Sequence, residues 1–396
     1  MGIAINGRQV RMKAPKDVLS LLSKLGIGRE AALVRVNGEL APDSAKLSPD
    51  DDIDVLRMRS KGEEPKKRAR RNGYKKTGVG SERKDSRLNA CFRCKKPAAV
   101  TLSYAGYSLC RQHFVAFFES RALRTVREFH MLKRGETVAV GLSGGKDSGV
   151  CLHLLHKISK SLPIKLIAIT IDSGIGKYSA TTLALAKREC RKLGVEHRIF
   201  SFKKLYGKSL DALLSEKGGK QACSFCGVMR RHALNRAARE AGASKLVIGH
   251  NADDVAQTVM MNFMRNEPER LARFGPVTGV VENGLFVKRI KPLFLAPERD
   301  VAAYALIKGI PIHHEQCPYA ENAFRQHVRR MLNETDEKYP ATKLRVVRAF
   351  LSQQKLLQEG AKMRLKEKGG KVGKCPSCGE PASGKGAVCS LCTMLG

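Results

Sequence analysis

Between residues 134 and 330, apolar runs that are typical of buried strands alternate with stretches of helical periodicity. The strand-like runs are Thr137–Val140, Lys165–Ile171, Glu196–Ser201 and Lys245–Ile248. Because alternating strands and helices build βαβ units, this region is predicted to form a doubly wound parallel sheet of the α/β class. Ligands of such sheets bind beyond the carboxyl ends of the strands. The segments that begin at Ser143, Asp172 and Gly249 are predicted to lie there.

Residues 1–58 have a different pattern and are predicted to form a small α+β domain of their own. The dipeptide Asn6-Gly7 between two short strand-like runs indicates a hairpin. Lys16–Leu25 has the pattern of a short amphipathic helix, and Ala32–Val36 and Ile53–Met58 are strand-like.

This order of two strands, a helix and two more strands resembles the β-grasp sulfur carriers, which are related to ubiquitin. Those carriers end in a free Gly-Gly whose carboxylate becomes a thiocarboxylate. In this chain Ser60-Lys61-Gly62-Glu63 stands in that place, with one Gly, and the chain continues. We therefore expect a docking module rather than a working carrier.

The rest of the chain is predicted to divide into four further parts. These are a basic linker at 59–88, a first metal knuckle with a helix at 89–133, a helical segment at 331–370 and a second knuckle at 371–396. The linker contains Lys66–Arg71 and Lys75-Lys76 and is too polar to fold alone. It is either a solvated tether or an arm that lies along a phosphate backbone.

The composition favours a polyanionic partner. The 396 residues carry 73 Lys and Arg against 37 Asp and Glu, which gives a formal charge of +36. A balance so one-sided indicates nucleic acid. Without an apolar run that could span a bilayer or a secretory signal pattern, we expect a cytoplasmic protein with no membrane partner. In a reducing compartment, most of the 12 cysteines are expected to be metal ligands or catalytic.

Two groups of cysteines have the spacing of zinc knuckles. The first comprises Cys91, Cys94, Cys110 and His113, and the second comprises Cys375, Cys378, Cys389 and Cys392. Each group offers four nitrogen or sulfur ligands, which suits a closed tetrahedral Zn²⁺ site. We expect two structural zinc ions.

A third group lacks a fourth ligand. Cys223 and Cys226 form a pair, and the next candidate is Cys317, far along the chain. Three thiolates with an open fourth position suit an iron–sulfur cluster with one exposed iron, or persulfide chemistry between two cysteines. A plain structural role is the alternative on spacing alone.

The string Ser143-Gly144-Gly145-Lys146-Asp147-Ser148 lies between a predicted strand and a predicted helix. Small residues at a helix N-terminus let backbone N–H groups approach phosphate oxygens. A P-loop NTPase would need Ser or Thr directly after the lysine, where this chain has Asp147. The string instead resembles the PP-loop of ATP pyrophosphatases, which split ATP between the α and β phosphates. We expect these six residues to bind ATP, with Asp172 and Gly249 beside them.

From Cys91 to Cys392 the chain resembles the tRNA 2-thiouridine synthetases of the PP-loop superfamily. The shared strings are Ser143–Ser148, Asp172–Gly176, Cys223–Arg231, Gly249–Asp254 and Cys317–Ala320, with the two knuckles. Many relatives carry Asp-Glu-Gly-Ile where this chain has Asp172-Ser173-Gly174-Ile175.

The resemblance implies a mechanism. ATP adenylates the C2 oxygen of a uridine, pyrophosphate leaves, and a sulfur species then displaces AMP. It also implies that Cys223, Cys226 and Cys317 hold a [4Fe–4S] cluster, and that Arg230 and Asp254 serve ATP binding and catalysis. A carboxylate such as Asp254 can hold Mg²⁺, and an arginine can offset phosphate charge. The alternatives are an RNA-facing role for Arg230 and a helix N-cap role for Asp254.

The resemblance leaves several questions open. We favour uridine 34 of the anticodon as the target over uridine 54 of the T loop, and 2-thiocytidine synthesis is a further alternative. An RNA-binding scaffold would explain the charge but not Ser143–Ser148. The sulfur donor, either sulfide or a carrier protein, and the oligomeric state, with a homodimer among the candidates, are not fixed by the sequence.

Overall fold

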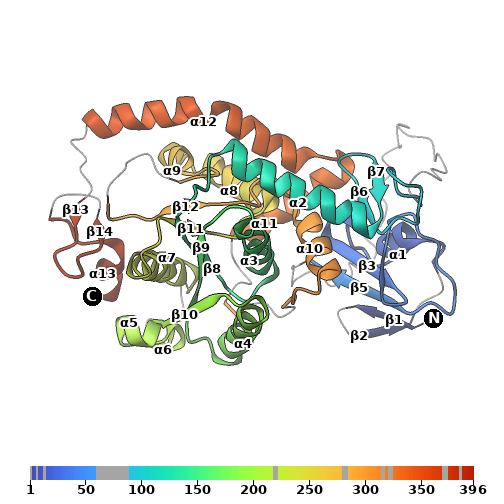
Figure 1. Ribbon diagram of the computed structural model, residues 1–396, viewed down its shortest axis with the longest axis horizontal. Helices are drawn as coiled ribbons and strands as arrows, with labels where there is room; N and C mark the ends of the chain where they lie inside the picture. Colours follow the sequence, from blue (N-terminus) through green and yellow to red (C-terminus); the bar gives the residue numbers. More distant parts are fainter. Residues whose placement is uncertain are drawn as a thin grey trace, which may run out of the picture.

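The computed structural model describes residues 2–5, 8–11, 15–58, 89–216, 222–278, 284–313, 317–319, 324–367, 373–382 and 386–396 (Figure 1). The predicted turn at Asn6-Gly7 and the basic linker at 59–88 lie outside these residues. None of the described helices is long and apolar enough to cross a membrane.

The N-terminal unit is a mixed five-stranded sheet with one helix. Its elements are β1 (Gly2–Ile5), β2 (Arg8–Arg11), α1 (Val18–Lys24), the 3-10 turn η1 (Arg29–Ala31), β3 (Ala32–Val36), β4 (Glu39–Ala41) and β5 (Ile53–Arg57). The strand order is β2-β1-β5-β3-β4, in which the central β1–β5 pair is parallel and the other pairs are antiparallel. A mixed sheet with one helix agrees with the predicted small α+β domain. Asp17 caps α1 by accepting a hydrogen bond from the Ser20 N–H at 2.7 Å.

The first knuckle region contains a short hairpin and a long helix. These are β6 (Val100–Leu102), β7 (Tyr107–Leu109) and α2 (Arg111–Glu128). Buried Phe114 and Phe118 of α2 contact the core that lies over the central sheet.

The central sheet has five parallel strands in the order β10-β9-β8-β11-β12. Its elements are β8 (Thr137–Gly141), α3 (Lys146–Ser159), β9 (Lys165–Asp172), α4 (Gly176–Leu193), β10 (Glu196–Ser201), α5 (Phe202–Tyr206), α6 (Leu210–Glu216), α7 (Ala222–Glu240), β11 (Lys245–Val247), α8 (Ala252–Met264), α9 (Pro268–Arg273), β12 (Lys288–Ile290) and α10 (Glu298–Ile307). The predicted doubly wound α/β sheet is confirmed.

Successive side chains of β8 pack into different cores, which shows which helix covers each face of the sheet. Val138 and Val140 pack into the core that includes α3, whereas Ala139 packs with Ala237 and Ala238 of α7. Because successive strand residues point to opposite faces, α3 and α7 cover opposite sides. Strands β9 and β10 lie on one side of β8, and β11 and β12 lie on its other side. The direction in which the chain adds strands to the sheet therefore reverses between β8 and β11.

The C-terminal part continues with α11 (Phe324–Lys338), α12 (Thr342–Glu367), β13 (Gly373–Lys374), β14 (Pro381–Ala382) and α13 (Ser390–Leu395). Helices α11 and α12 pack on α8 and α9 around Val328, Val347 and Phe350. Figure 1 shows the second knuckle beside α7, at the opposite end of the molecule from the N-terminal unit.

The N-terminal unit is docked on the body of the protein through a buried ion pair. Arg299 of α10 donates from Nη1 to Asp43 Oδ2 at 3.1 Å and from Nη2 to Asp43 Oδ1. The Asp43 N–H in turn donates to Thr101 Oγ1 at 3.1 Å. Leu33, Leu56 and Met58 add apolar contacts with the core around α2 and α3.

Replacing Arg299 with Met should lower the free energy of unfolding by about 3–5 kcal/mol, because Asp43 would remain buried without its partner. Asp43 is 1 % exposed. Urea unfolding measures the loss, and the double variant Arg299→Met/Asp43→Leu should regain most of it. Arg111→Met, which breaks an exposed pair with Glu39, is the control and should cost less than about 1 kcal/mol. A loss below about 1 kcal/mol for Arg299→Met would show that this pair does not hold the interface.

Candidate functional site

A cavity of about 290 Å³ lies where the strand order reverses. Three strand ends supply most of its wall: residues 141–143, 145, 147 and 148 after β8, residues 169–173 of β9 and beyond, and residues 248–250 after β11. Helix α4 contributes Tyr178 and Thr182, and α7 contributes Arg230. The three segments that the sequence places beyond the strand ends therefore meet in one cavity.

The loop Ser143–Ser148 runs from β8 into the first turn of α3. Ser148 Oγ accepts a hydrogen bond from the Ser143 N–H at 3.1 Å and donates to the Gly145 carbonyl at 2.9 Å. These bonds fold the loop around the N-terminus of a 14-residue helix. Unpaired N–H groups and the helix dipole make such a position favourable for a phosphate.

Two glycines let backbone segments approach this loop closely. Gly144 has φ +73°, and a Cβ placed there would lie 2.2 Å from the carbonyl oxygen of Thr182 in α4. A Cβ at Gly249 would lie 2.8 Å from the backbone nitrogen of Ser148. A side chain at either position would displace backbone, so both glycines are required by the shape of the cavity.

Lys146 is only 5 % exposed and is held by two carboxylates. Its Nζ lies 2.9 Å from Glu298 Oε1 and 3.0 Å from Asp147 Oδ2. Glu298 also pairs with Arg329 of α11. Burial would raise the pKa of Glu298, but Arg329 and Lys146 hold it well below its usual value. The positive charge of Lys146 is therefore shared with acidic partners.

Asp147 and Asp254 lie on facing segments near the cavity. Asn251 is the N-cap of α8, accepting from the Asp254 N–H at 3.0 Å, and its Nδ2 donates to Asp147 Oδ1 at 3.1 Å. Asp254 is thus the third helical residue of a capping box, and the predicted alternative of an N-cap role for Asp254 is wrong. Burial, with the charges of Asp147 and Glu298, raises the pKa of Asp254 to about 6.

Arg230 connects the cavity with the cysteine group. It lines the cavity, and its Nη2 donates to Ser173 Oγ at 3.1 Å and to Cys226 Sγ at 3.3 Å. Asp172, at the end of β9, accepts from the Gly174 N–H at 2.9 Å and also lines the cavity.

The third cysteine group, Cys223, Cys226 and Cys317, lies at one side of α7. Cys223 and Cys226 lie in its first turns, and Cys223 Sγ donates to the Tyr319 carbonyl at 3.4 Å. Burial and the neighbouring thiols Cys317 and Cys226 raise the pKa of Cys223, and Arg230 lowers it. Cys223 is exposed, while Cys226 and Cys317 are half-buried, so the group is open to solvent on one side.

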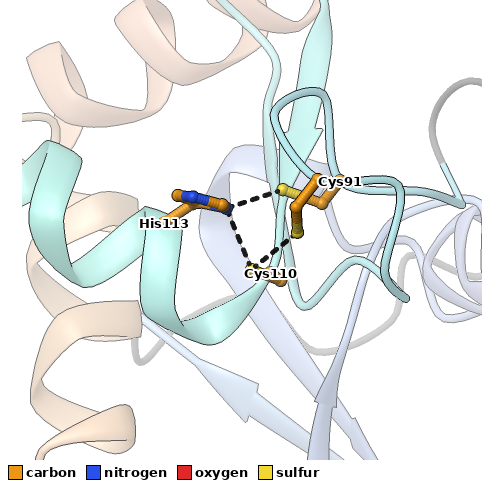
Figure 2. A group of neighbouring side chains, drawn as sticks. Cys91, Cys110 and His113 are labelled. Atoms are coloured by element: carbon orange, nitrogen blue, oxygen red, sulfur yellow. Dashed lines mark hydrogen bonds between the residues drawn. The ribbon is translucent and has the colours of Figure 1, made fainter.

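The four ligand atoms of the first knuckle lie within 4.8 Å of one another, and Figure 2 labels three of these residues, Cys91, Cys110 and His113. Cys91 Sγ and Cys110 Sγ each lie 3.4 Å from His113 Nδ1, and Cys94 Sγ lies 3.8 Å from Cys110 Sγ. Burial would raise the pKa of Cys91, but hydrogen bonds from backbone N–H groups lower it to about 6. These four side chains suit Zn²⁺.

The second knuckle is equally compact. Cys378 Sγ lies 3.6 Å from Cys389 Sγ, and the Cys389 N–H donates to Cys375 Sγ at 3.3 Å. Among the described residues, the two knuckles are the groups whose ligand atoms all lie within 4.8 Å of one another. Cys223, Cys226 and Cys317 do not form such a group.

Several residues at the site were not found from the sequence. Ser173 directly follows β9 and Asn251 lies four positions after β11. Both stand in strings that the sequence places beyond the strand ends, but neither was singled out as a site residue. Glu298 and Arg329 left no local signal, since they reach the loop from distant helices. His250 lines the cavity, and burial together with Lys291 and two arginines lowers its pKa to about 3.

Comparison with known proteins gives a consistent picture. A family model described as a PP-loop domain matches residues 118–335. The chain is 33% identical over 306 residues to the tRNA-5-methyluridine(54) 2-sulfurtransferase of Pyrococcus horikoshii, which covers 77% of this chain and 93% of that protein. It is 37% identical to cytoplasmic tRNA 2-thiolation protein 1 of Mus musculus, over 77% of this chain and 71% of that protein.

A solved structure is also similar. It is the U34-tRNA thiolase NcsA of Methanococcus maripaludis with its [4Fe-4S] cluster, at a TM-score of 0.66 and 34% identity. The match covers 78% of this chain and 95% of that chain.

Gly144→Ala should weaken ATP binding about tenfold or more, because the new methyl group would displace the loop from α4. Gly207→Ala is the matched control: Gly207 has φ +78°, close to that of Gly144, but a Cβ added at Gly207 would meet no atom within 4 Å. Calorimetric titration with ATP measures both variants. Equal binding by the two would mean that the close approach to Thr182 does not shape the cavity.

Proposed function

Because the chain belongs to the tRNA 2-thiolation proteins of the PP-loop family, we propose that it is an ATP-dependent sulfurtransferase that converts uridine 34 of tRNA to 2-thiouridine. The observation that carries the proposal is the position of Arg230. One side chain lines the nucleotide cavity and contacts Cys226 of the cysteine group. Activation of an oxygen and delivery of sulfur need such adjacent sites.

The first step joins the uridine to AMP. The C2 oxygen of the uridine attacks the α-phosphorus of ATP, and the bond to the β-phosphate oxygen breaks, so pyrophosphate leaves. The loop Ser143–Ser148 and the N-terminus of α3 hold the phosphates. Arg230 offsets the charge that develops on the α-phosphate, and its buried Nε has no hydrogen-bond partner among the described residues.

The second step transfers sulfur. A sulfur nucleophile adds at C2 of the adenylated uridine, the C2–O bond breaks, and AMP departs with the oxygen. The cysteine group lies beside the cavity, so the donor and the activated carbon are held close together.

Cys223, Cys226 and Cys317 suit a [4Fe–4S] cluster, since they are three thiols that open to solvent on one side and do not form a group as tight as either knuckle. Such a cluster supplies an exposed iron that can hold sulfide. We assign Zn²⁺ to the two knuckles and Mg²⁺ to the carboxylates of Asp147 and Asp254. The raised pKa of Asp254 supports a cation there, because a cation would offset the crowding of acidic charge.

Uridine 34 is proposed on two grounds. The similar solved structure is a U34-tRNA thiolase, and strings such as Gly249–Asp254 resemble the anticodon branch of the family, although His113 and Gly176–Ser179 resemble its T-loop branch. Uridine 54 is the second candidate, since the Pyrococcus horikoshii relative is named for that position.

The partners follow from the same proposal. A formal charge of +36 supports binding of the tRNA phosphate backbone. Sulfide or a sulfur-carrier protein is the donor, the protein acts in the cytoplasm, and a homodimer is its proposed assembly.

With ATP, Mg²⁺, sulfide and unmodified tRNA, the anaerobically reconstituted protein should form 2-thiouridine at position 34. Digestion of the tRNA and mass spectrometry locate the modified base. Asp147→Ala is the control: it should bind tRNA normally but form no AMP, because Asp147 lines the nucleotide cavity and a carboxylate does not attract tRNA phosphates. Thiolation at position 54 would overturn the choice of uridine, and normal AMP formation by Asp147→Ala would overturn the assignment of the loop.

Replacing Cys223, Cys226 or Cys317 with Ala should remove the broad visible absorbance of the cluster and thiolation together. Both knuckles would remain intact, so zinc measured by mass spectrometry should stay at the wild-type level. Cys190→Ala is the control, because Cys190 is buried in the core on α4 and should retain full iron content. A wild-type protein that takes up zinc but no iron anaerobically would favour persulfide chemistry instead.

A further inference from the structure

The second knuckle packs directly on the helix that carries the cysteine group. Buried Met229 and Ala233 of α7 share one apolar core with Cys375, Cys389 and Leu391 of the knuckle. Partly buried Phe225, Cys226, Val228, Cys317 and Tyr319 pack against the same core. Figure 1 shows β13, β14 and α13 beside α7. The knuckle thus forms part of the support beneath the cysteines.

A single buried carboxylate joins the knuckle to α7. Glu380 is 3 % exposed and lies two positions after the knuckle ligand Cys378. It pairs with Arg239 Nη2 and accepts from Asn235 Nδ2 at 3.3 Å. Both partners belong to α7.

Each end of this link is fixed by further bonds. On the knuckle side, the Glu380 carbonyl accepts from the Cys375 N–H at 2.8 Å, so folding of the metal site sets where the carboxylate lies. On the helix side, Asn235 donates to the Leu285 carbonyl at 2.9 Å and accepts from the Val287 N–H at 3.0 Å. Glu380 therefore ties α7 to a metal-dependent loop, while Asn235 ties it to the chain before β12.

A second contact lies closer to the cysteines. His232 of α7 has its Nε2 3.7 Å from Cys378 Sγ and its Nδ1 3.0 Å from the Tyr206 hydroxyl. His232 lies two positions after Arg230, the residue that contacts both the cavity and Cys226. The knuckle therefore touches α7 at both ends of the stretch from residue 232 to residue 239.

We propose that the second knuckle positions the cysteine group and that Glu380 is the positioning residue. With its metal bound, the knuckle holds Glu380 against Asn235 and Arg239, and this fixes α7 so that Cys223, Cys226 and Arg230 keep their places. Loss of the Glu380 carboxylate leaves the half-buried Arg239 without its charged partner and loosens the helix. The effect on iron rests on the proposed function; the effect on α7 does not.

Glu380→Gln tests the proposal in the full-length, zinc-loaded protein. Hydrogen exchange of the α7 amides, residues 222–240, should become about tenfold faster, since a buried charged hydrogen bond is lost. After reconstitution, iron should be lost to a chelator several-fold faster. Zinc content and the dissociation constant for ATP should not change, because Glu380 is neither a ligand nor part of the cavity.

Two further variants keep the result interpretable. Glu39→Gln removes an exposed carboxylate that pairs with Arg111 near the first knuckle, and α7 exchange should stay at the wild-type rate. Arg239→Lys keeps the charge but loses the fixed geometry of the guanidinium, so it should give an intermediate exchange rate. If Glu380→Gln does not fold, the exchange rate of Arg239→Lys still tests the contact between Glu380 and α7.

Unchanged exchange of α7 in both Glu380→Gln and Arg239→Lys would overturn the proposal. Faster exchange with unchanged retention of iron would also overturn it, because the helix would then move without affecting the cysteines. If the wild-type protein takes up no iron, the proposed cluster fails. The exchange of α7 and the alkylation rates of Cys223 and Cys226 then decide the positioning role.

Discussion

The buried ion pair between Lys146 and Glu298 holds the cavity together. Lys146 is the first residue of α3, and Glu298 is the first residue of α10, so the pair clamps the N-termini of two helices at one edge of the sheet. The Glu298 N–H also donates to Asp253 Oδ2 at 2.7 Å, which adds α8 to the same junction. Lys146 pairs with Asp147 and Glu298, and Glu298 also pairs with Arg329. These charges would be costly to bury separately, and their mutual pairing makes the arrangement specific.

This junction also includes α11. Arg329 of α11 pairs with Glu298, and Arg325, one turn earlier, donates to Thr258 Oγ1 at 3.1 Å. Helix α11 begins seven positions after Cys317. The cavity and the cysteine group are connected through Arg230, which lines the one and contacts Cys226 of the other. A reaction with two ordered steps benefits when both sites keep one fixed geometry.

What the sequence revealed depended on how local each signal was. The knuckles, the loop Ser143–Ser148 and the strands β8–β10 are defined by residues a few positions apart, so spacing and periodicity predicted them. The Lys146–Glu298 pair joins residues 152 positions apart, and neither residue stands in a pattern that indicates the other. The short strand β12 was missed for the same reason: three residues show no periodicity, and their strand character comes from pairing with β11.

The N-terminal unit packs on the body of the protein beside the first knuckle and α10. Here Met58, directly after β5, is buried in the core that also contains Cys91 of the first knuckle. The last strand therefore ends against the first knuckle, while Cys226 and Arg230 lie on α7 on the other side of the central sheet. With Asp43 also buried under Arg299, moving this unit would expose an ion pair and apolar surface together. Among the described residues, its contacts to the body include those with the first knuckle region and α10.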